Sequence, residues 1–451
     1  MTLNPYVRKN LSLAWPLALN ALLMQSMLMI DTLLVSPLGE ISLAAMGIAF
    51  TIVSFLLGIQ ISLANGSQLV LSRAFGSGQD SALNKGFWAA ILINGCIAVL
   101  FLALLTLADS ALISALTNDD LLKQETARYL SVAKYIVVIN AATQVMIALF
   151  NALGKTKLPF KGYLLEAPIN VAVSYAMIYG MGSWQGVGVQ GAAIGSLVAI
   201  TVRLLFLVFC LQRSHVRLSL RTLDASLRRN AINHFKEIFP VAANVTMLMT
   251  GATLYMLTFS QLPLYSYVAI TIIMPWVKAG NQFITAWAVS SAITISQAIG
   301  SKQLDDLRKN VDVSIDVAVA ISALSCLAFL GLSFLLPHLY SNLDPDTYLA
   351  LAVIAPLYIF LPIVRGYNTV HGQVLRALGK TTEVFKINFT GQWVIALPLC
   401  AAIVLWLEGS IFWAFAVMPL EEIVKAWPFR RLARRSLDEF DAEKAKQLMY
   451  D

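Results

Sequence analysis

The stretch from Leu11 to Pro37, LSLAWPLALNALLMQSMLMIDTLLVSP, is almost entirely apolar and carries a single carboxylate, Asp31. It is long enough to cross a bilayer as a helix, which requires about 20 residues. Asp31 lies about five residues from the far end of the segment, roughly 7–8 Å below the surface at ~1.5 Å per residue. An acid at that depth faces protein or a wet cavity, because a charge in hydrocarbon is costly. Burial disfavours the charged form of a carboxyl group, so Asp31 is predicted to bind and release a proton. The alternative is a satisfied polar group near a helix end.

Composition places the whole chain in the membrane class. Of its 451 residues, 58% are hydrophobic and 13% are charged, whereas soluble domains carry about 25% charged residues. The net charge of +7 does not indicate nucleic-acid binding, because the basic residues lie in loops between apolar segments. The four cysteines lie in apolar segments and the four histidines are scattered, so neither set predicts a disulfide or a metal site. We expect no cleavable signal peptide, because the first apolar segment is too long and has no small-residue cleavage site. The chain has no GxxxxGK[ST] motif, which excludes direct ATP coupling by this chain.

Twelve apolar segments match the length of a membrane-spanning helix. They lie at about residues 11–36, 43–72, 87–108, 126–150, 162–182, 189–212, 235–259, 264–296, 311–336, 347–375, 384–407 and 410–429. Lys and Arg gather in the even-numbered connections and at both ends, whereas the odd-numbered connections hold only Lys123. Basic loops stay in the cytoplasm, so both termini are predicted to be cytoplasmic. We therefore expect an all-α, multi-pass protein of the bacterial inner membrane, with Asp31 in the outer half of the first helix.

The chain also repeats itself. The matching segments are SRAFGSGQDSALNKG (72–86) with SQAIGSKQLDDLRKN (296–310), WPLALN (15–20) with FPVAAN (239–244), and NALGKT (151–156) with RALGKT (376–381). The offset between partners is 224 residues in the first two pairs and 225 in the third. This predicts two six-helix bundles related by a pseudo-two-fold axis along the membrane normal, a design that binds cargo between its halves. The predicted lobes are residues 1–212 and 235–429, with a basic linker at 213–234 and a cytoplasmic tail at 430–451.

Polar residues within the first six segments form a predicted pocket around Asp31. Asn140 and Gln144 lie four residues apart, as do Asn170 and Ser174, so each pair shares one face of a helix. If these faces meet Asp31, they supply the partners that a buried acid needs; otherwise they are polar contacts between helices. The full predicted set is Asn20, Gln25, Asn140, Gln144, Asn170, Ser174 and Tyr175, with Pro16 as a hinge or a fixed kink.

The second half carries different chemistry. The counterpart of Asp31, 224 residues further on, is Tyr255, so we expect ion handling to belong to the first half. Lys278 and Arg365 lie mid-span, and no acid lies in the middle of the seventh to eleventh segments. We expect Tyr255, Lys278 and Arg365 to line a cavity, unless the two cations pair with a partner. Without an acid in these segments, carbonyl or water ligands or an anionic group of a cargo would hold the cations.

Four other charged residues in the apolar segments have simpler interpretations. Arg203 is expected to extend towards the cytoplasmic surface, and Glu166 to reach water near the inner end of its segment. Glu421 and Lys425 lie four residues apart and are predicted to pair with each other.

The 6+6 repeat, the sequence Ala74-x-Gly76-x-Gly78 after the second segment and NALGKTKLP (151–159) after the fourth resemble the MATE family of multidrug and toxic compound extrusion transporters. The acid of the first segment, with Pro16 before it, and the absence of acids from the seventh, eighth and tenth segments are similar to the DinF branch. The resemblance covers essentially the whole chain. It implies a V-shaped, outward-open fold that exports cationic or amphipathic compounds in exchange for protons or sodium.

By this resemblance Asp31 matches an acid that is protonated as helix 1 bends at its proline, and Asn170 matches an asparagine of the same pocket. The branch often has a second acid where this chain has Ser174, and the sodium-linked acids of another branch have no counterpart, so protons are favoured over sodium. We expect a monomeric drug–proton antiporter that is not an enzyme and uses no cofactor. The alternative is a flippase of a lipid-linked precursor, whose phosphates Lys278 and Arg365 would bind. A third class, a channel, fits the duplicated architecture poorly.

Overall fold

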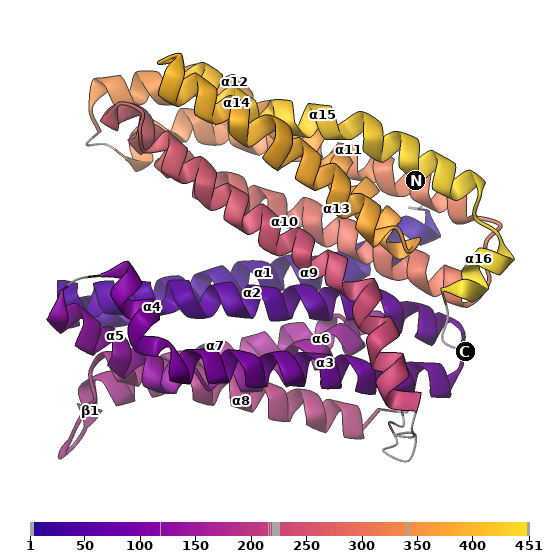
Figure 1. The fold of residues 1–451 in the computed structure, drawn as a ribbon, viewed down its shortest axis with the longest axis horizontal. Coiled ribbons are helices and arrows are strands. Elements are labelled where there is room, and N and C mark those ends of the chain that lie inside the picture. The colour runs from indigo at the N-terminus through magenta and orange to yellow at the C-terminus, as the bar shows by residue number, and fades with distance from the viewer. Residues whose placement is uncertain are drawn as a thin grey trace. The chain divides into compact units, whose positions relative to one another are not determined.

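The computed structural model describes residues 4–117, 119–214, 216, 218, 226–340 and 343–448. Helices dominate this part of the chain, which confirms the all-α prediction, and a small hairpin pairs β1 (Gly180–Met181) with β2 (Trp184–Gln185). The helices, which Figure 1 traces in chain order, are α1 (Pro5–Val35), α2 (Glu40–Gly76), α3 (Asp80–Leu107), α4 (Asp109–Leu116), α5 (Asp120–Ala133), α6 (Ile136–Ala152), α7 (Lys157–Tyr179), α8 (Val189–Gln212), α9 (Ser226–Phe259), α10 (Leu264–Gly300), α11 (Leu307–Leu339), α12 (Pro345–Ala377), α13 (Thr381–Phe389), α14 (Leu397–Ala401), α15 (Ile411–Asp438) and α16 (Ala442–Gln447).

These helices account for the twelve predicted segments. Among the described residues, nine spans are long and apolar enough to cross a membrane, and the pair α5 and α6, bent by 42°, makes a tenth. One of the nine, Thr381–Trp406, consists of α13, a π-helical segment (Thr390–Ala396), α14 and a second π-helical segment (Ala402–Trp406). The remaining two predicted segments are α7 and α15, in which Glu166 and the trio Glu421, Glu422 and Lys425 interrupt the apolar sequence. The predicted twelve-helix fold is therefore confirmed.

The repeated sequence ALGKT ends two helices in the same way. After α6, Gly154 has φ +73° and Lys155 N donates to Phe150 O at 2.8 Å. After α12, Gly379 has φ +78° and Lys380 N donates to the carbonyl oxygen of residue 375 at 2.8 Å. Glycine tolerates this left-handed conformation because it has no Cβ, and the bond from the next residue satisfies a carbonyl that the helix end leaves free. The duplication seen in the sequence is thus a duplication of backbone geometry.

The chain forms two compact units. The first-half unit is Leu19–Ala242, and the second-half unit combines Met1–Ala18 with Ala243–Leu448. Both boundaries fall inside a helix, at Ala18 in α1 and Ala242 in α9, each two residues after a proline of the repeated motif. The first turns of α1 and α9 therefore belong to a different unit from the rest of the helix, which the predicted lobes, 1–212 and 235–429, did not anticipate.

Side-chain contacts within each unit show why these first turns belong there. In the second-half unit, Thr294 Oγ1 on α10 donates to Asn10 Oδ1 at 2.9 Å. In the first-half unit, His234 Nε2 on α9 lies 2.8 Å from Ser67 Oγ on α2. Of the predicted linker 213–234, residues 215, 217 and 219–225 lie outside the described residues, as do 449–451 of the predicted tail. The described parts of both segments include helix, since α9 begins at Ser226 and α15 continues to Asp438.

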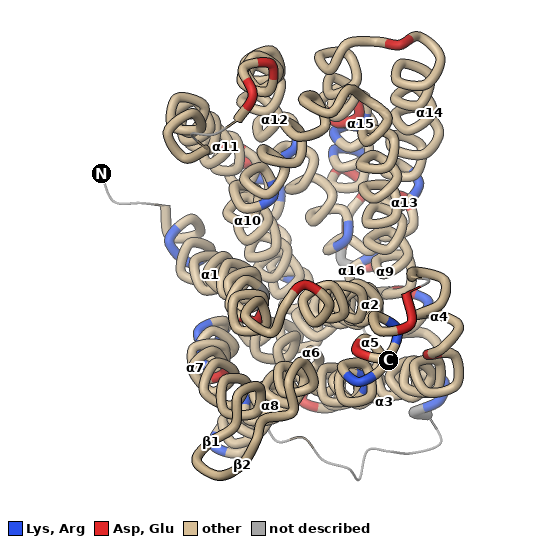
Figure 2. The backbone as a smooth tube through the Cα atoms, turned by 90° about the vertical axis from the view of Figure 1, so that its left-hand side faces the viewer, with Lys and Arg blue, Asp and Glu red and all other residues tan. Residues whose placement is uncertain are grey.

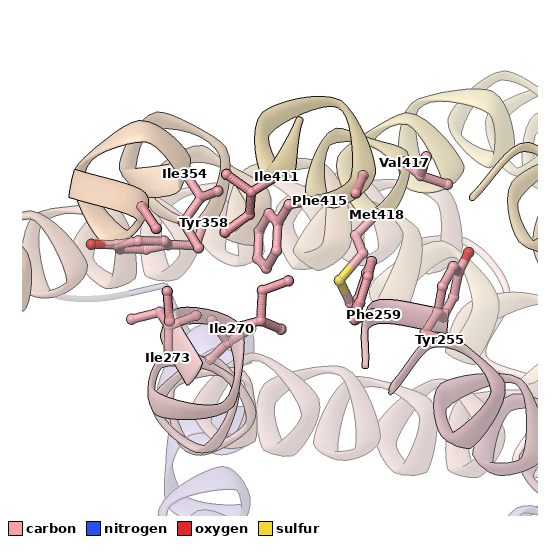
Figure 3. Close-up of a cluster of buried hydrophobic side chains, with 14 of the residues drawn as sticks. Tyr255, Phe259, Ile270, Ile273, Ile354, Tyr358, Ile411, Phe415, Val417 and Met418 are labelled. Carbon is pink, nitrogen blue, oxygen red and sulfur yellow. The ribbon is translucent and has the colours of Figure 1, made fainter. Parts of the chain in front are cut away.

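Each unit has its own apolar core. In the second-half unit, α9, α10, α12 and α15 contribute the side chains that Figure 3 labels, including Phe259, Ile273, Tyr358 and Phe415. In the first-half unit, Val35 at the end of α1 is fully buried in a cluster with residues of α2, α5 and α8. Residues four apart lie on one face of a helix, so the face of α1 that carries Asp31 points into this unit.

Candidate functional site

Asp31 lies on the protein-facing side of α1. Its neighbours Met29 and Leu33 are 67% and 70% exposed, and residues two positions away lie on nearly the opposite face of a helix. Those two apolar side chains are suited to lipid, while the side chain of Asp31 is partly buried against α8. The carboxylate therefore faces protein, as its cost in hydrocarbon requires.

Two polar side chains form a hydrogen-bonded chain that ends at Asp31. Asn170 Nδ2 on α7 donates to Ser196 Oγ on α8 at 3.0 Å, and Ser196 Oγ donates to Asp31 Oδ2 at 3.3 Å. Asp31 Oδ1 is buried and has no hydrogen-bond partner among the described residues. The same residues offer Asp31 no ion-pair partner, so the hydroxyl of Ser196 is the one described group that stabilises its charge.

The other predicted pocket residues of α1 and α7 differ in their placement. Asn20 is buried in the same unit, and its Oδ1 has no partner in the described part of the chain. Ser174 is fully buried where α7 meets α8, and a methyl group added to Gly195 would lie 2.7 Å from Ser174 N. Gln25 and Tyr175 are exposed, Tyr175 by 57%, and the Tyr175 ring packs on Tyr179 at 5.0 Å. Among the described residues neither Gln25 nor Tyr175 forms a hydrogen bond with Asp31, so their place in the pocket stays a prediction.

Asn140 and Gln144 belong to a different network. Gln144 Nε2 donates to Asn140 Oδ1 at 3.0 Å, and Asn140 Nδ2 donates to Gln60 Oε1 at 2.9 Å. Gln60 Nε2 in turn donates to the carbonyl oxygen of Val137 at 2.8 Å, which links α2 to α6. The shared helix face expected from their spacing is present, and Asn140 uses it to join α6 to α2, which is one of the two roles that the sequence left open.

Arg203 and Glu166 form a buried ion pair, which corrects two expectations. Arg203 Nη1 on α8 lies 2.6 Å from Glu166 Oε2 on α7, with side chains 3% and 7% exposed. The guanidinium also lies over the ring of Tyr163, 4.1 Å from its centroid. Arg203 therefore does not extend to the surface and Glu166 does not reach water, because each satisfies the charge of the other.

The second-half unit contains a charged cluster on α15, where acidic and basic positions lie close together along one helix (Figure 2). The predicted pair is confirmed, with Lys425 Nζ 2.8 Å from Glu421 Oε1, and Lys425 also lies 3.4 Å from Glu422 Oε1. Tyr255 Oη donates to Glu421 Oε2 at 2.7 Å. Tyr255 is only 4% exposed, so its side chain lies in the core of the unit and does not line an open cavity.

Arg365 has an acid partner after all. Its Nε lies 3.3 Å from Glu422 Oε1, and Asn368 Nδ2 donates to Glu422 Oε2 at 2.8 Å. The expectation of an unpaired cation was wrong because the partner comes from the twelfth span, outside the seventh to eleventh segments that were searched. Lys278 is exposed on α10 and forms no ion pair with any described residue. Within the described residues, no three of the His, Cys, Asp and Glu side chains are grouped to hold a metal ion.

Comparisons with known proteins agree with this architecture. The family model described as MatE matches residues 16–176. The chain is 23% identical to the uncharacterized transporter YisQ of Bacillus subtilis over 413 residues, 86% of this chain and 85% of that protein. It is 24% identical to the probable multidrug resistance protein NorM of Burkholderia pseudomallei over 421 residues, 88% of this chain and 86% of that one. The Vibrio cholerae MATE transporter VcmN in its bent form superposes with a TM-score of 0.84 at 18% identity, covering 97% of this chain and 99% of that one.

In the sequence of residues 16–176 and in the fold of the whole chain, the protein is thus similar to the MATE transporters. Within the MATE fold, Pro16 lies buried inside the continuous helix α1, so its role as a hinge stays a prediction. Two residues of the polar clusters were missed from the sequence. Ser196 follows a run of small residues in α8 and gives no signal by itself, whereas Glu422 stands next to Glu421 in an apolar segment and could have been found from that pair of acids.

Proposed function

We propose that this MATE transporter is a secondary antiporter of the bacterial inner membrane that exports cationic or amphipathic drugs in exchange for protons, with Asp31 as the protonation site. The observation that carries the proposal is the environment of Asp31: a carboxylate on a membrane-spanning helix that accepts from Ser196 and has no cation beside it among the described residues. Such a group gains or loses its charge at lower cost than one held in an ion pair.

The ligand set favours a proton over sodium. A proton binds to a single carboxylate oxygen, whereas hard metal cations collect several oxygen ligands. Asp31 offers one carboxylate, and the next polar atoms in its chain are Ser196 Oγ and the Asn170 amide. Each unit of pH difference across the membrane contributes about 1.4 kcal/mol per proton, so a modest gradient can drive useful export.

Exchange of Asp31 for asparagine tests the proposal. Asp31→Asn keeps the shape and the acceptor oxygen but cannot change charge, so drug-induced proton flux in proteoliposomes should be lost while thermal unfolding in detergent stays close to wild type. Asp120→Asn is the matched control, because Asp120 is 97% exposed at the start of α5. Full drug–proton exchange by the Asp31→Asn protein would refute the assignment.

A second candidate, a flippase of a lipid-linked precursor, is favoured by one observation. Lys278 is an exposed cation far from either end of α10, and Arg365 on α12 is partly exposed. Cations in such positions suit the phosphates of a lipid head group. Reconstituted protein tested in parallel for dye export and for the flipping of a lipid-linked pyrophosphate separates the two functions.

A further inference from the structure

Arg365 occupies the edge of the charged cluster in the second-half unit. Its side chain is 30% exposed, whereas that of its partner Glu422 is 8% exposed. The guanidinium donates through Nε to Glu422 Oε1 at 3.3 Å. Its two terminal nitrogens have no partner among the described residues. The cluster therefore ends in a cation that uses one of its three nitrogens and still reaches the surface of the unit.

The surroundings of Glu422 fix the orientation of Arg365. Asn368 Nδ2 donates both to Glu422 Oε2 at 2.8 Å and to the backbone oxygen of Glu422 at 2.7 Å. Lys425 Nζ lies 3.4 Å from Glu422 Oε1 on the same helix. With the carboxylate held from two sides, the guanidinium plane that it anchors is held as well. A guanidinium anchored through Nε presents its other two nitrogens as a fork that matches a carboxylate or a phosphate.

The charges of this region leave a net positive field. The charged side chains of α10, α12 and α15 that lie far from the helix ends are Lys278, Arg365 and Lys425 against Glu421 and Glu422, which sum to +1. The two glutamates are engaged by Lys425 and Arg365, so Lys278 carries the excess charge. Helices α10 and α12 pack closely, since a methyl group on Gly366, next to Arg365, would lie 3.2 Å from Ile284 Cγ2. Lys278 precedes Ile284 by six residues, roughly 9 Å along α10.

We propose that Arg365, oriented by Glu422, is a subsite for an oxyanion group of the cargo, a carboxylate or a phosphate, and that Lys278 adds attraction for the same charge. The transporter would then accept zwitterionic or anionic amphiphiles in addition to cations. The inference rests on the proposed function only in taking the cargo to be an amphiphile. Its test is equilibrium binding, so a failure of proton coupling at Asp31 leaves it unaffected.

The experiment compares two probes that differ in a single charge. A rhodamine dye with a free carboxylate and its methyl ester are titrated against purified full-length protein in detergent, with fluorescence anisotropy as the readout. Wild-type protein should bind the acid roughly tenfold more tightly than the ester, the size expected of a charge-assisted bidentate contact. A parallel competition with dodecyl phosphate and an uncharged dodecyl glycoside asks whether a lipid-type phosphate uses the same fork.

Variants of Arg365 decide the outcome. Arg365→Gln should bring the acid-to-ester ratio to about one, and Arg365→Lys should keep only part of it, because it retains the charge and loses the fork. Arg365→Gln combined with Glu422→Gln restores the local charge balance and should remain unselective. Arg435→Gln is the control that should keep the wild-type ratio, because Arg435 on α15 forms an exposed ion pair with Glu439, the residue that follows the helix.

If the preference for the dye acid over its ester is lost in Arg365→Gln, the subsite binds drug carboxylates. If Arg365→Gln weakens only the binding of dodecyl phosphate, the subsite binds lipid phosphates. Equal binding of acid and ester by the wild type, together with no effect of Arg365→Gln on phosphate competition, would overturn the proposal. Recovery of selectivity in the double variant would also overturn it, because Arg365 would then serve only to neutralise Glu422.

Discussion

Removal of the Ser196 hydroxyl should shift the pH dependence of transport in a direction that the structure fixes. Ser196 Oγ donates to Asp31 Oδ2 at 3.3 Å, and it is the hydrogen-bond partner that the described residues give this carboxylate. The bond stabilises the ionised form of the acid, so its loss in Ser196→Ala makes protonation easier. The pH at which drug–proton exchange is half-maximal should therefore rise.

The size of the shift follows from the geometry. Hydrogen bonds to charged groups contribute about 1.5–3 kcal/mol, and a distance of 3.3 Å is long for a hydroxyl donor, so the lower end applies. Since ~1.4 kcal/mol corresponds to one pH unit, the midpoint should rise by about one unit.

The assay is dye efflux from proteoliposomes across a series of pH values. Thr201→Val is the control, because Thr201 lies on the same helix α8 and its hydroxyl donates to the backbone oxygen of Leu197 in its own helix, at 2.7 Å. A Ser196→Ala midpoint equal to that of wild type, or one that falls, would refute the role given to the hydroxyl. A shift of the same size in Thr201→Val would show that any loss of a hydroxyl on α8 has this effect.

Three further predictions concern stability, each measured by thermal unfolding in detergent. Glu166→Ala should destabilise the protein by about 3–5 kcal/mol because it leaves Arg203 buried without a partner; adding Arg203→Leu should recover part of the loss, and additive losses would contradict the pairing. Gly195→Ala should lower the free energy of unfolding by about 1–3 kcal/mol, because its methyl group would lie 2.7 Å from Ser174 N and push α7 away from α8. Wild-type stability would show that the two helices can separate at no cost. Tyr255→Phe should cost about 1–3 kcal/mol, since it removes the donor to a buried glutamate of α15 at 2.7 Å; an unchanged melting curve would count against that hydrogen bond.

The sequence predicts the twelve helices well because each leaves two local signals, an apolar run of bilayer length and basic residues at one side. It also predicts Asp31 as a buried acid, because a carboxylate in an apolar run must face protein or a water-filled cavity and not lipid. Both signals are readable within about 30 residues of chain, and neither depends on how the helices pack.

The partners of those residues could not be predicted, because they depend on packing between distant helices. Ser196 meets Asp31 from 165 residues away, and Glu422 meets Arg365 from 57 residues away. The assumption that a cation seeks its acid within the seventh to eleventh segments failed for this reason. The sequence also contains no sign that the first turns of α1 and α9 belong to a different compact unit from the rest of each helix, since helix periodicity is the same on both sides of Ala18 and Ala242.

The two halves of the duplicated fold treat their buried acids differently: Asp31 has no described ion-pair partner, whereas Glu421 pairs with a cation. In the first half, the first and sixth spans meet through the hydroxyl of Ser196 and the acid of Asp31; in the second half, the equivalent spans meet through the hydroxyl of Tyr255 and the acid of Glu421. The acid has moved to the other helix of the pair, where Lys425 lies 2.8 Å from it. Lys425 also lies 3.4 Å from Glu422, so Glu421 belongs to a network of opposite charges, whereas the described residues give Asp31 no charged partner. If Asp31 is the protonation site that we propose, the same contact between helices acts as a switch in one half and as a fixed ion-paired contact in the other.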